Sequence, residues 1–286
     1  MAALPPGFAF SGMPIQLGGI TFGQVDEEGV HWHCSTISGW DSPDVKTTVT
    51  PREAAHGSWM SPVYLAERVV TLAGKAFAPD RGAMDRAMEH LLAAASLTDT
   101  TLTVWETIPK QLTVRRSGKV LAERMTDRVL DWSVLLTAPD PRRYGTTLRT
   151  ASTGLPSTTG GLVLPAAPPW TLSAATVSGF LQADNEGSIV SYPGLTITGP
   201  VQQPTVSVRY PDGTVTALAY NGELANGDVL TLATDTHTAT VGGASRRRNL
   251  SGDWPQIPPG GAQILFGAAV YSATATLTAA WRPAWT

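Results

Sequence analysis

Short runs of alternating apolar and polar residues, separated by turn residues, constrain the fold of the second half of the chain. Residues 206–210 and 214–220 flank Pro211-Asp212-Gly213. Because Pro presets φ and Gly readily takes a left-handed conformation, we expect a β-hairpin here. Residues 273–281 alternate small or large apolar side chains with mainly hydroxylated ones, which is typical of an antiparallel strand with one solvated face. Short strands at this spacing predict a β-sandwich.

The first half of the chain is predicted to be mainly strand, with a single helix. Residues 102–107, 112–114 and 132–137 show a period of two. A helix is predicted near residues 83–96, where apolar side chains recur at helical spacing, and Asp80 is expected to cap its first turn. The predicted stripe, which we interpret as core packing, consists of Met84, Ala87, Met88, Leu91, Leu92 and Ala95.

Charge is distributed unevenly and suggests two domains. Residues 1–145 contain 14 basic and 16 acidic side chains, whereas residues 146–286 contain 6 and 7. Residues 150–169 are mostly Ser, Thr, Gly, Ala and Pro and contain no charged residue, a composition typical of a connector or a set of loops. We therefore predict a boundary just after Tyr144, which gives domains 1–145 and 146–286.

Composition excludes several classes of protein. The net charge is −3, so the chain lacks the excess of basic residues that nucleic-acid-binding proteins show. The longest apolar run, residues 264–271, is too short to cross a bilayer, so no membrane insertion is expected. Residues 1–10 lack the basic and apolar regions of a signal peptide. The single cysteine, Cys34, cannot form an internal disulfide.

Residues that could bind a metal or transfer protons do not form a recognisable site in the sequence. His31 and His33 would share one face of a strand while Cys34 points the other way, so we expect a half-buried strand or loop and not a metal site. Residues 26–28 (Asp-Glu-Glu) lack the ligand spacing of a calcium loop and are interpreted as a solvated acidic loop. Known nucleophile, zinc and phosphate-binding motifs are missing. We therefore predict no catalytic, cofactor-binding or metal-binding residue.

Two features of the second half of the chain could bind a partner protein or a ligand. Residues 246–248 are three consecutive arginines in a charge-poor region, and they could contact an acidic face of a partner or a phosphate. Trp281 and Trp285 could stack on sugar rings, although burial in a sandwich explains Trp281 equally well.

Several longer segments resemble the distal tail proteins of long, flexible-tailed bacteriophages. Residues 132–145 (WSVLLTAPDPRRYG) resemble the end of the first domain in that family. Their Asp140, Pro141, Arg142 and Tyr144 stand in the segment that leads into the second domain. Residues 37–130 are similar more loosely, and residues 150–192 depart most from the family pattern. The similar segments of the second domain are residues 193–208, 224–234, 236–243 and 254–266.

The resemblance implies a mainly β fold with two parts. The first would be a tail-tube-like β-barrel or sandwich with one helix, and the second a galectin-like β-sandwich. Such proteins form a ring, usually a hexamer, at the distal end of the tail. The ring joins the tail tube to the tail-tip hub and lets DNA pass through its lumen. The resemblance thus implies a structural virion protein made in the bacterial cytoplasm, with no enzymatic activity and no cofactor.

Two other classes of function remain open at this point. A carbohydrate-binding module for cell-wall glycans would explain a β-sandwich and its tryptophans. A wall-degrading enzyme would need two carboxylates at a fixed separation, and the acids of the second half stand mostly beside turn-like glycines.

Overall fold

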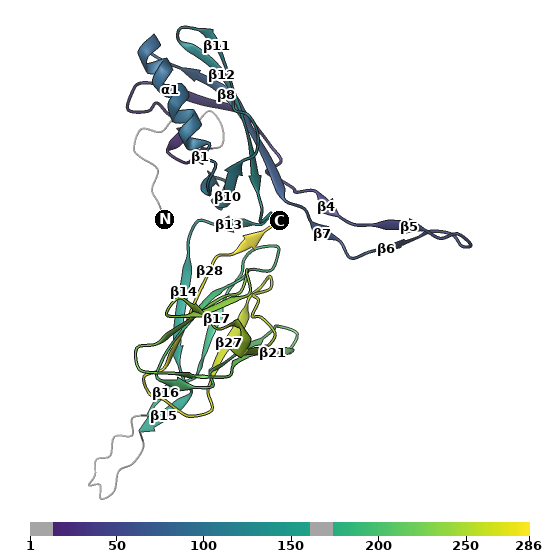
Figure 1. Ribbon diagram of the computed structural model, residues 1–286, viewed down its shortest axis with the longest axis vertical. Coiled ribbons are helices and arrows are strands. Elements are labelled where there is room, and N and C mark those ends of the chain that lie inside the picture. Colours follow the sequence, from purple (N-terminus) through teal and green to yellow (C-terminus); the bar gives the residue numbers. More distant parts are fainter. Residues whose placement is uncertain (1–13, 161–173) are drawn as a thin grey trace, which may run out of the picture. The chain divides into compact units, whose positions relative to one another are not determined.

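The computed structural model describes residues 14–160 and 174–286, and its chain forms two compact units (Figure 1). The first unit comprises residues 1–146 together with Thr286, and the second comprises residues 147–285. Strands predominate in both units, and α1 is the one α-helix of the described ranges. The expectation of a mainly β chain with one helix is confirmed.

The first unit is built on one large sheet. Its central strand order is β2-β1-β9-β10-β12-β8-β3, with β11 beside β12 and β13 beside β10. The elements are β1 (Ile15–Leu17), β2 (Ile20–Phe22), β3 (His31–Ser38), β4 (Val45–Lys46), β5 (Val49–Pro51), β6 (Ser58–Met60), β7 (Tyr64–Leu65), β8 (Arg68–Phe77), α1 (Arg81–Ala94), β9 (Thr100–Val104), β10 (Lys110–Arg116), β11 (Leu121–Thr126), β12 (Val129–Ala138) and β13 (Arg143–Gly145).

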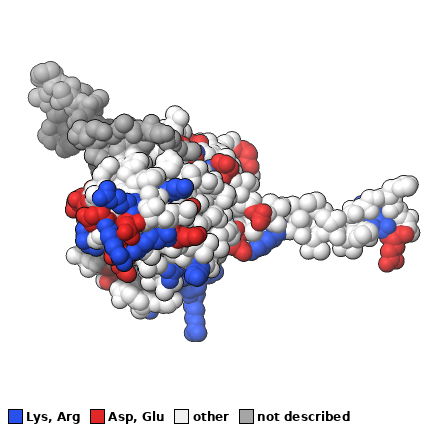
Figure 2. All heavy atoms as spheres, turned by 90° about the horizontal axis from the view of Figure 1, so that it is seen from above, with Lys and Arg blue, Asp and Glu red and all other residues white. Residues whose placement is uncertain are grey.

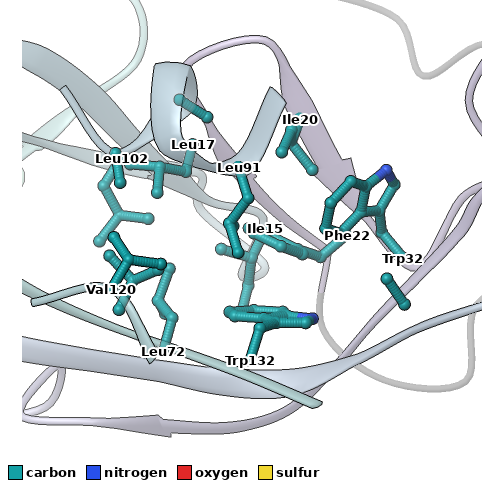
Figure 3. Packing of buried hydrophobic residues seen from close by; sticks show 14 of the residues in the cluster. Ile15, Leu17, Ile20, Phe22, Trp32, Leu72, Leu91, Leu102, Val120 and Trp132 are labelled. Atoms are coloured by element: carbon teal, nitrogen blue, oxygen red, sulfur yellow. The ribbon is translucent and has the colours of Figure 1, made fainter. Parts of the chain in front are cut away.

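Aromatic and aliphatic side chains form the core of this unit between the sheet and α1 (Figure 3). The ring of Phe22 stacks on that of Trp132, with 4.8 Å between centroids, and meets Trp32 edge-on at 6.3 Å. From α1, Leu91 is completely buried in the same cluster. One apolar cluster therefore joins the sheet to α1.

Helix α1 begins and packs largely as its sequence predicts. The carboxylate of Asp80 accepts a hydrogen bond of 2.8 Å from the Ala83 amide, which confirms the expected N-cap. Met84 and Leu91 are fully buried. Leu92, however, is 42% exposed, so its assignment to the core is wrong. Because each helical residue turns by about 100°, Leu92 lies beside the buried face and not on it.

The second unit is a sandwich of two sheets that share one core. The strand orders are β14-β28-β18-β23-β24-β25 and β17-β27-β20-β21-β26. Buried side chains from both sheets, such as Leu195 and Ile264, belong to a single cluster. The elements are β14 (Arg149–Gly154), β15 (Ser157–Gly160), β16 (Ala174–Val177), β17 (Phe180–Ala183), β18 (Gly194–Thr198), β19 (Val201–Gln202), β20 (Thr205–Arg209), β21 (Val215–Tyr220), β22 (Glu223–Leu224), β23 (Val229–Ala233), β24 (Thr238–Val241), β25 (Ala244–Ser245), the 3-10 turn η1 (Arg247–Asn249), β26 (Leu250–Gly252), β27 (Ala262–Gly267), β28 (Thr276–Trp281) and β29 (Ala284–Trp285).

Most strand predictions for this unit are confirmed, and one is wrong. Strands β20 and β21 form the predicted hairpin, and Gly213 has the left-handed φ of +85° that its turn requires. Residues 150–169 were expected to be loops, yet residues 150–154 lie in β14, where Ala151 faces Ala279 of β28. Residues 157–160 form β15, which pairs with β16. Ser and Thr are common in linkers and in strands alike. The composition of residues 150–154 therefore could not show that they pair with β28. Residues 161–169 lie outside the described residues.

Candidate functional site: the arm and its base

A two-stranded ribbon leaves the sheet of the first unit between β3 and β8, and we call residues 45–65 the arm (Figure 1). Strand β4 pairs with β7, and β5 pairs with β6, where Thr50 faces Trp59. A two-stranded ribbon is only marginally stable in water by itself.

The arm carries large apolar side chains that its own chain leaves uncovered. Every residue from 45 to 64 is exposed, and Trp59 is 66% exposed although the guanidinium of Arg52 lies 4.3 Å from its ring centroid. Figure 2 shows a projection that is mostly uncharged, with acidic and basic residues near its end. The exposed large apolar residues of the arm are Val45, Val49, Trp59, Met60, Val63 and Tyr64. Apolar residues gathered in this way are typical of a protein–protein contact.

The arm is anchored by a buried arginine at its base. Arg68, the first residue of β8, is fully buried. Its guanidinium donates hydrogen bonds to the carbonyls of Gly39 (3.3 Å) and Trp40 (2.5 Å), which precede the arm, and to the carbonyl of Pro141 (2.8 Å). Burial, with the nearby charge of Arg143, lowers the pKa of Arg68 to about 10, so the side chain stays charged near pH 7. One cation thus joins both ends of the arm to the segment around Pro141.

Trp40 connects this anchor to a second charged group. Its indole N–H donates to the Glu106 carboxylate at 2.5 Å, and Lys110 forms an ion pair with the same carboxylate. The guanidinium of Arg143 lies 3.6 Å from Glu106 and 5.5 Å from the centroid of the Trp40 ring. Partial burial by itself raises the pKa of Glu106, but the contacts with Lys110, Trp40 and Arg143 together outweigh it and hold the pKa below its usual range. The base of the arm is therefore fixed by polar contacts that a deformation would have to break.

The four predicted junction residues lie together in this region. The Asp140 carboxylate accepts hydrogen bonds from the Arg142 guanidinium (3.0 Å) and from the Tyr144 hydroxyl (2.5 Å). Burial, followed by the charge of Asp140, raises the pKa of Tyr144 far above its usual range, so the phenol remains a donor. Pro141 contributes its carbonyl to Arg68. The segment is thus a fixed turn tied to the base of the arm.

The other residues of the first unit considered from sequence have structural contacts. Of the strand or loop expected at residues 31–34, the structure shows a strand, β3, and the ring of His31 stacks on Phe77 at 6.1 Å. Burial raises the pKa of the Cys34 thiol. Asp26 was expected in a solvated loop, but its carboxylate accepts hydrogen bonds from the amides of Glu28 and Val30 and from the Trp32 indole, so that expectation is wrong for Asp26. The turn needs this acceptor for its own N–H groups.

In the second unit, Trp281 is 5% exposed, and its indole donates to the Asp184 carbonyl at 2.8 Å. Burial is therefore the correct explanation of Trp281, and it cannot stack on a sugar. Across residues 14–160 and 174–286, no three His, Cys, Asp or Glu side chains gather in a way that could hold a metal ion. In the same ranges no helix has the length and apolarity needed to cross a membrane.

Comparison with solved structures identifies the fold of this chain. No protein-family model matches the chain, and no curated protein sequence does. The Dit protein of phage SPP1, described as a paradigm of the hub adsorption apparatus in phages that infect Gram-positive bacteria, superposes with a TM-score of 0.62 at 12% identity. That match covers 96% of this chain and 99% of the SPP1 protein. The chain has the distal tail protein fold.

A second solved structure agrees with this assignment. A chain of the phage P2 baseplate, in its activated conformation with Ca, gives a TM-score of 0.50 at 12% identity and covers 94% of this chain and 97% of its own. The resemblance to distal tail proteins stated from the sequence is thereby confirmed for the fold.

Sequence reasoning missed the arm and its arginine anchor, the two features that define this candidate site. Apolar and polar residues do not alternate clearly along the arm, and residues 45–65 contain two prolines. The pairing of its strands was therefore not evident from the sequence. Arg68 stands at the start of an apolar alternation that runs to Phe77. An arginine at that position was the available signal, because a charge on an otherwise buried face needs dedicated partners.

Proposed function

We propose that this protein is a structural, non-enzymatic component of a phage tail tip, and that its copies associate through the arm. The observation that carries the proposal is the arm itself, a ribbon without a core whose large apolar side chains, Trp59 and Met60 among them, are exposed. Covering them with a second protein surface removes apolar area from water, which favours association. The fixed base around Arg68 presents the arm in one orientation and so lowers the entropic cost of that association.

A contact between the arm of one copy and a different surface of the next is heterologous, and such contacts close into rings when the rotation permits. We propose a ring, hexameric as the resemblance implies, at the distal end of the tail. Residues 1–145 would form the ring, and residues 146–286 would be an appended galectin-like sandwich. The ring would join the tail tube protein to the tail-tip hub. A net charge of −3 suits a lumen that DNA crosses without being retained.

The test is the oligomeric state of the full chain, measured by light scattering and by negative-stain imaging, alone and with a tail tube protein. We expect closed rings. The variant Trp59→Ser/Met60→Ser should lose them, while a matched variant of two exposed apolar residues outside the arm, Phe180→Ser/Val215→Ser, should keep them. A monomer at high concentration that forms no ring with the tube protein would contradict the proposal.

The alternative of a carbohydrate-binding module is weakened by one observation. Of the two tryptophans considered for sugar stacking, Trp281 is buried. Binding of purified protein to cell-wall glycans, abolished by Trp285→Ala, would favour that alternative.

A further inference from the structure

We propose that Arg246, Arg247 and Arg248, at one edge of the second unit's sandwich, bind an extended acidic segment of a partner protein. This interaction is separate from self-association through the arm and does not depend on it.

The three arginines stand where both sheets of the sandwich end. Turn η1 connects β25, the last strand of the six-stranded sheet, to β26, the last strand of the five-stranded sheet. Among the described strands, β25 pairs only with β24, and β26 pairs only with β21. An edge strand has main-chain N–H and C=O groups available for another extended chain.

An aromatic stack holds the central arginine in place. The guanidinium of Arg247 lies 5.2 Å from the centroid of the Trp254 ring. The ring of His237 is nearly parallel to that of Trp254, at 5.0 Å and 18°. Trp254 itself packs against the buried core. A guanidinium stacked on an aromatic ring is oriented in advance and keeps its N–H donors for a carboxylate.

The turn that carries the arginines is also anchored. The amide of Arg246 donates to the Ala239 carbonyl of β24 at 2.8 Å, and the amide of Asn249 donates back to the Arg246 carbonyl at 2.9 Å. The arginines therefore project from a fixed backbone, which reduces the entropy lost when a partner binds.

Charge in this region is not neutralised by the protein. The second unit contains only six basic residues, and residues 246–248 are three of them. Arg149 forms an ion pair with Glu186, whereas Arg246, Arg247 and Arg248 are exposed and form no ion pair among the described residues. Neighbouring Asp235 and Asp253 do not pair with them either.

The geometry favours an extended partner over a single small anion. Successive residues of a 3-10 turn point about 120° apart, because the turn has three residues per revolution. Arg247 and Arg248 lie within the turn and Arg246 precedes it, so the three side chains do not all leave the backbone in one direction. This arrangement suits carboxylates spaced along a peptide better than a single phosphate. A strand-like peptide could instead place carboxylates along the turn while its main chain pairs with the open edge of β25 or β26, which a phosphate polymer cannot do.

The test uses the full chain and fluorescently labelled, end-capped peptides, with binding followed by anisotropy at low and high salt. The main probe alternates Glu with Thr. A Glu–Pro peptide keeps the charge but lacks half of the N–H donors needed for strand pairing, and a Lys–Thr peptide reverses the charge. Long-chain polyphosphate is tested both as a competitor and as a ligand. It represents phosphate polymers, the alternative to an acidic peptide.

We expect the Glu–Thr peptide to bind, the Glu–Pro peptide to bind more weakly, and the Lys–Thr peptide not to bind. Arg246→Gln/Arg248→Gln and Arg247→Gln should each weaken binding, by about tenfold for the double variant, since exposed ion pairs contribute modestly and are screened by salt. Arg209→Gln, which removes another exposed arginine of the same unit, should leave binding unchanged. Thermal melting of each variant shows that the sandwich is intact.

Three results would overturn the proposal. The first is no binding of the Glu–Thr peptide at low salt. The second is an equal loss with Arg209→Gln, which would show a general charge effect. The third is binding of polyphosphate, sensitive to the arginine variants, without binding of the peptide; this would identify the turn as a site for a phosphate polymer.

Discussion

The two units of this chain differ in where their exposed apolar side chains lie. In the second unit the large exposed ones, such as Phe180, Val215 and Val229, are scattered over the sandwich. In the first unit six of them gather on the arm, beyond the reach of the core that runs from Ile15 to Ala138. Isolated exposed apolar residues are ordinary on protein surfaces, whereas several on one short ribbon are typical of a protein–protein contact. On our proposal, the first unit is therefore the one that a neighbouring copy covers.

The sharpest test of the arm's role compares a core tryptophan of the first unit with the tryptophan on its arm. Trp132→Ala should lower the free energy of unfolding by about 3–5 kcal/mol, because it opens a cavity beside Phe22. Trp59→Ala on the arm should change it by less than about 0.5 kcal/mol in the monomer. Chemical denaturation at low protein concentration measures both. Equal losses would mean that the arm belongs to the folded core.

The base of the arm should be the next most sensitive place. Arg68→Met removes the donors to the carbonyls of Gly39, Trp40 and Pro141 and should cost about 2–4 kcal/mol, since buried acceptors then lack partners. Hydrogen exchange should become faster around residues 39–41 and 140–142. Arg68→Lys, which keeps the charge but not the planar fork, should be intermediate. A fully stable Arg68→Met protein would show that the anchor is dispensable.

The arm itself should affect association more than stability. Trp59→Ser/Met60→Ser should raise the dissociation constant between copies by about 30-fold, or roughly 2 kcal/mol, as expected when a central apolar contact is lost. Sedimentation over a range of concentrations measures this constant. The same constant in the variant and in the wild-type protein would remove the arm from the interface.

A smaller effect is expected at the start of α1. Asp80→Ala leaves the Ala83 amide without its acceptor and should cost about 1 kcal/mol, while Asp80→Ser should be nearly neutral. Calorimetry should show the shift in the melting of the first unit alone. A shift in the melting of the second unit would mean that the two units unfold together.

The smallest effect is expected from separating the units. The first core cluster lies within residues 15–138, and the second within residues 155–281. A fragment that ends at Gly145 should therefore be soluble and melt cooperatively within a few degrees of the first transition of the full chain. Aggregation of this fragment, relieved only by adding residues 146–286, would show that the proposed domain boundary is wrong.

Local sequence patterns determined the elements whose stabilising contacts lie close in the chain. Asp80 and the apolar spacing from Met84 to Leu91 specify where α1 begins and which face it buries. Pro211-Asp212-Gly213 determines the β20–β21 hairpin, because the turn residues need only the adjacent strands. Residues 132–145 and the segments of the second unit carried enough similarity to indicate the distal tail fold.

Features that depend on distant partners became visible only in the folded chain. Strand β14 exists because β28, more than a hundred residues later, completes its ladder. Arg68 is buried because carbonyls from two separate segments surround it. The arm is exposed because no core extends beneath it. Sequence spacing reports contacts within a few residues, whereas these outcomes depend on which distant backbone groups the folded chain brings together.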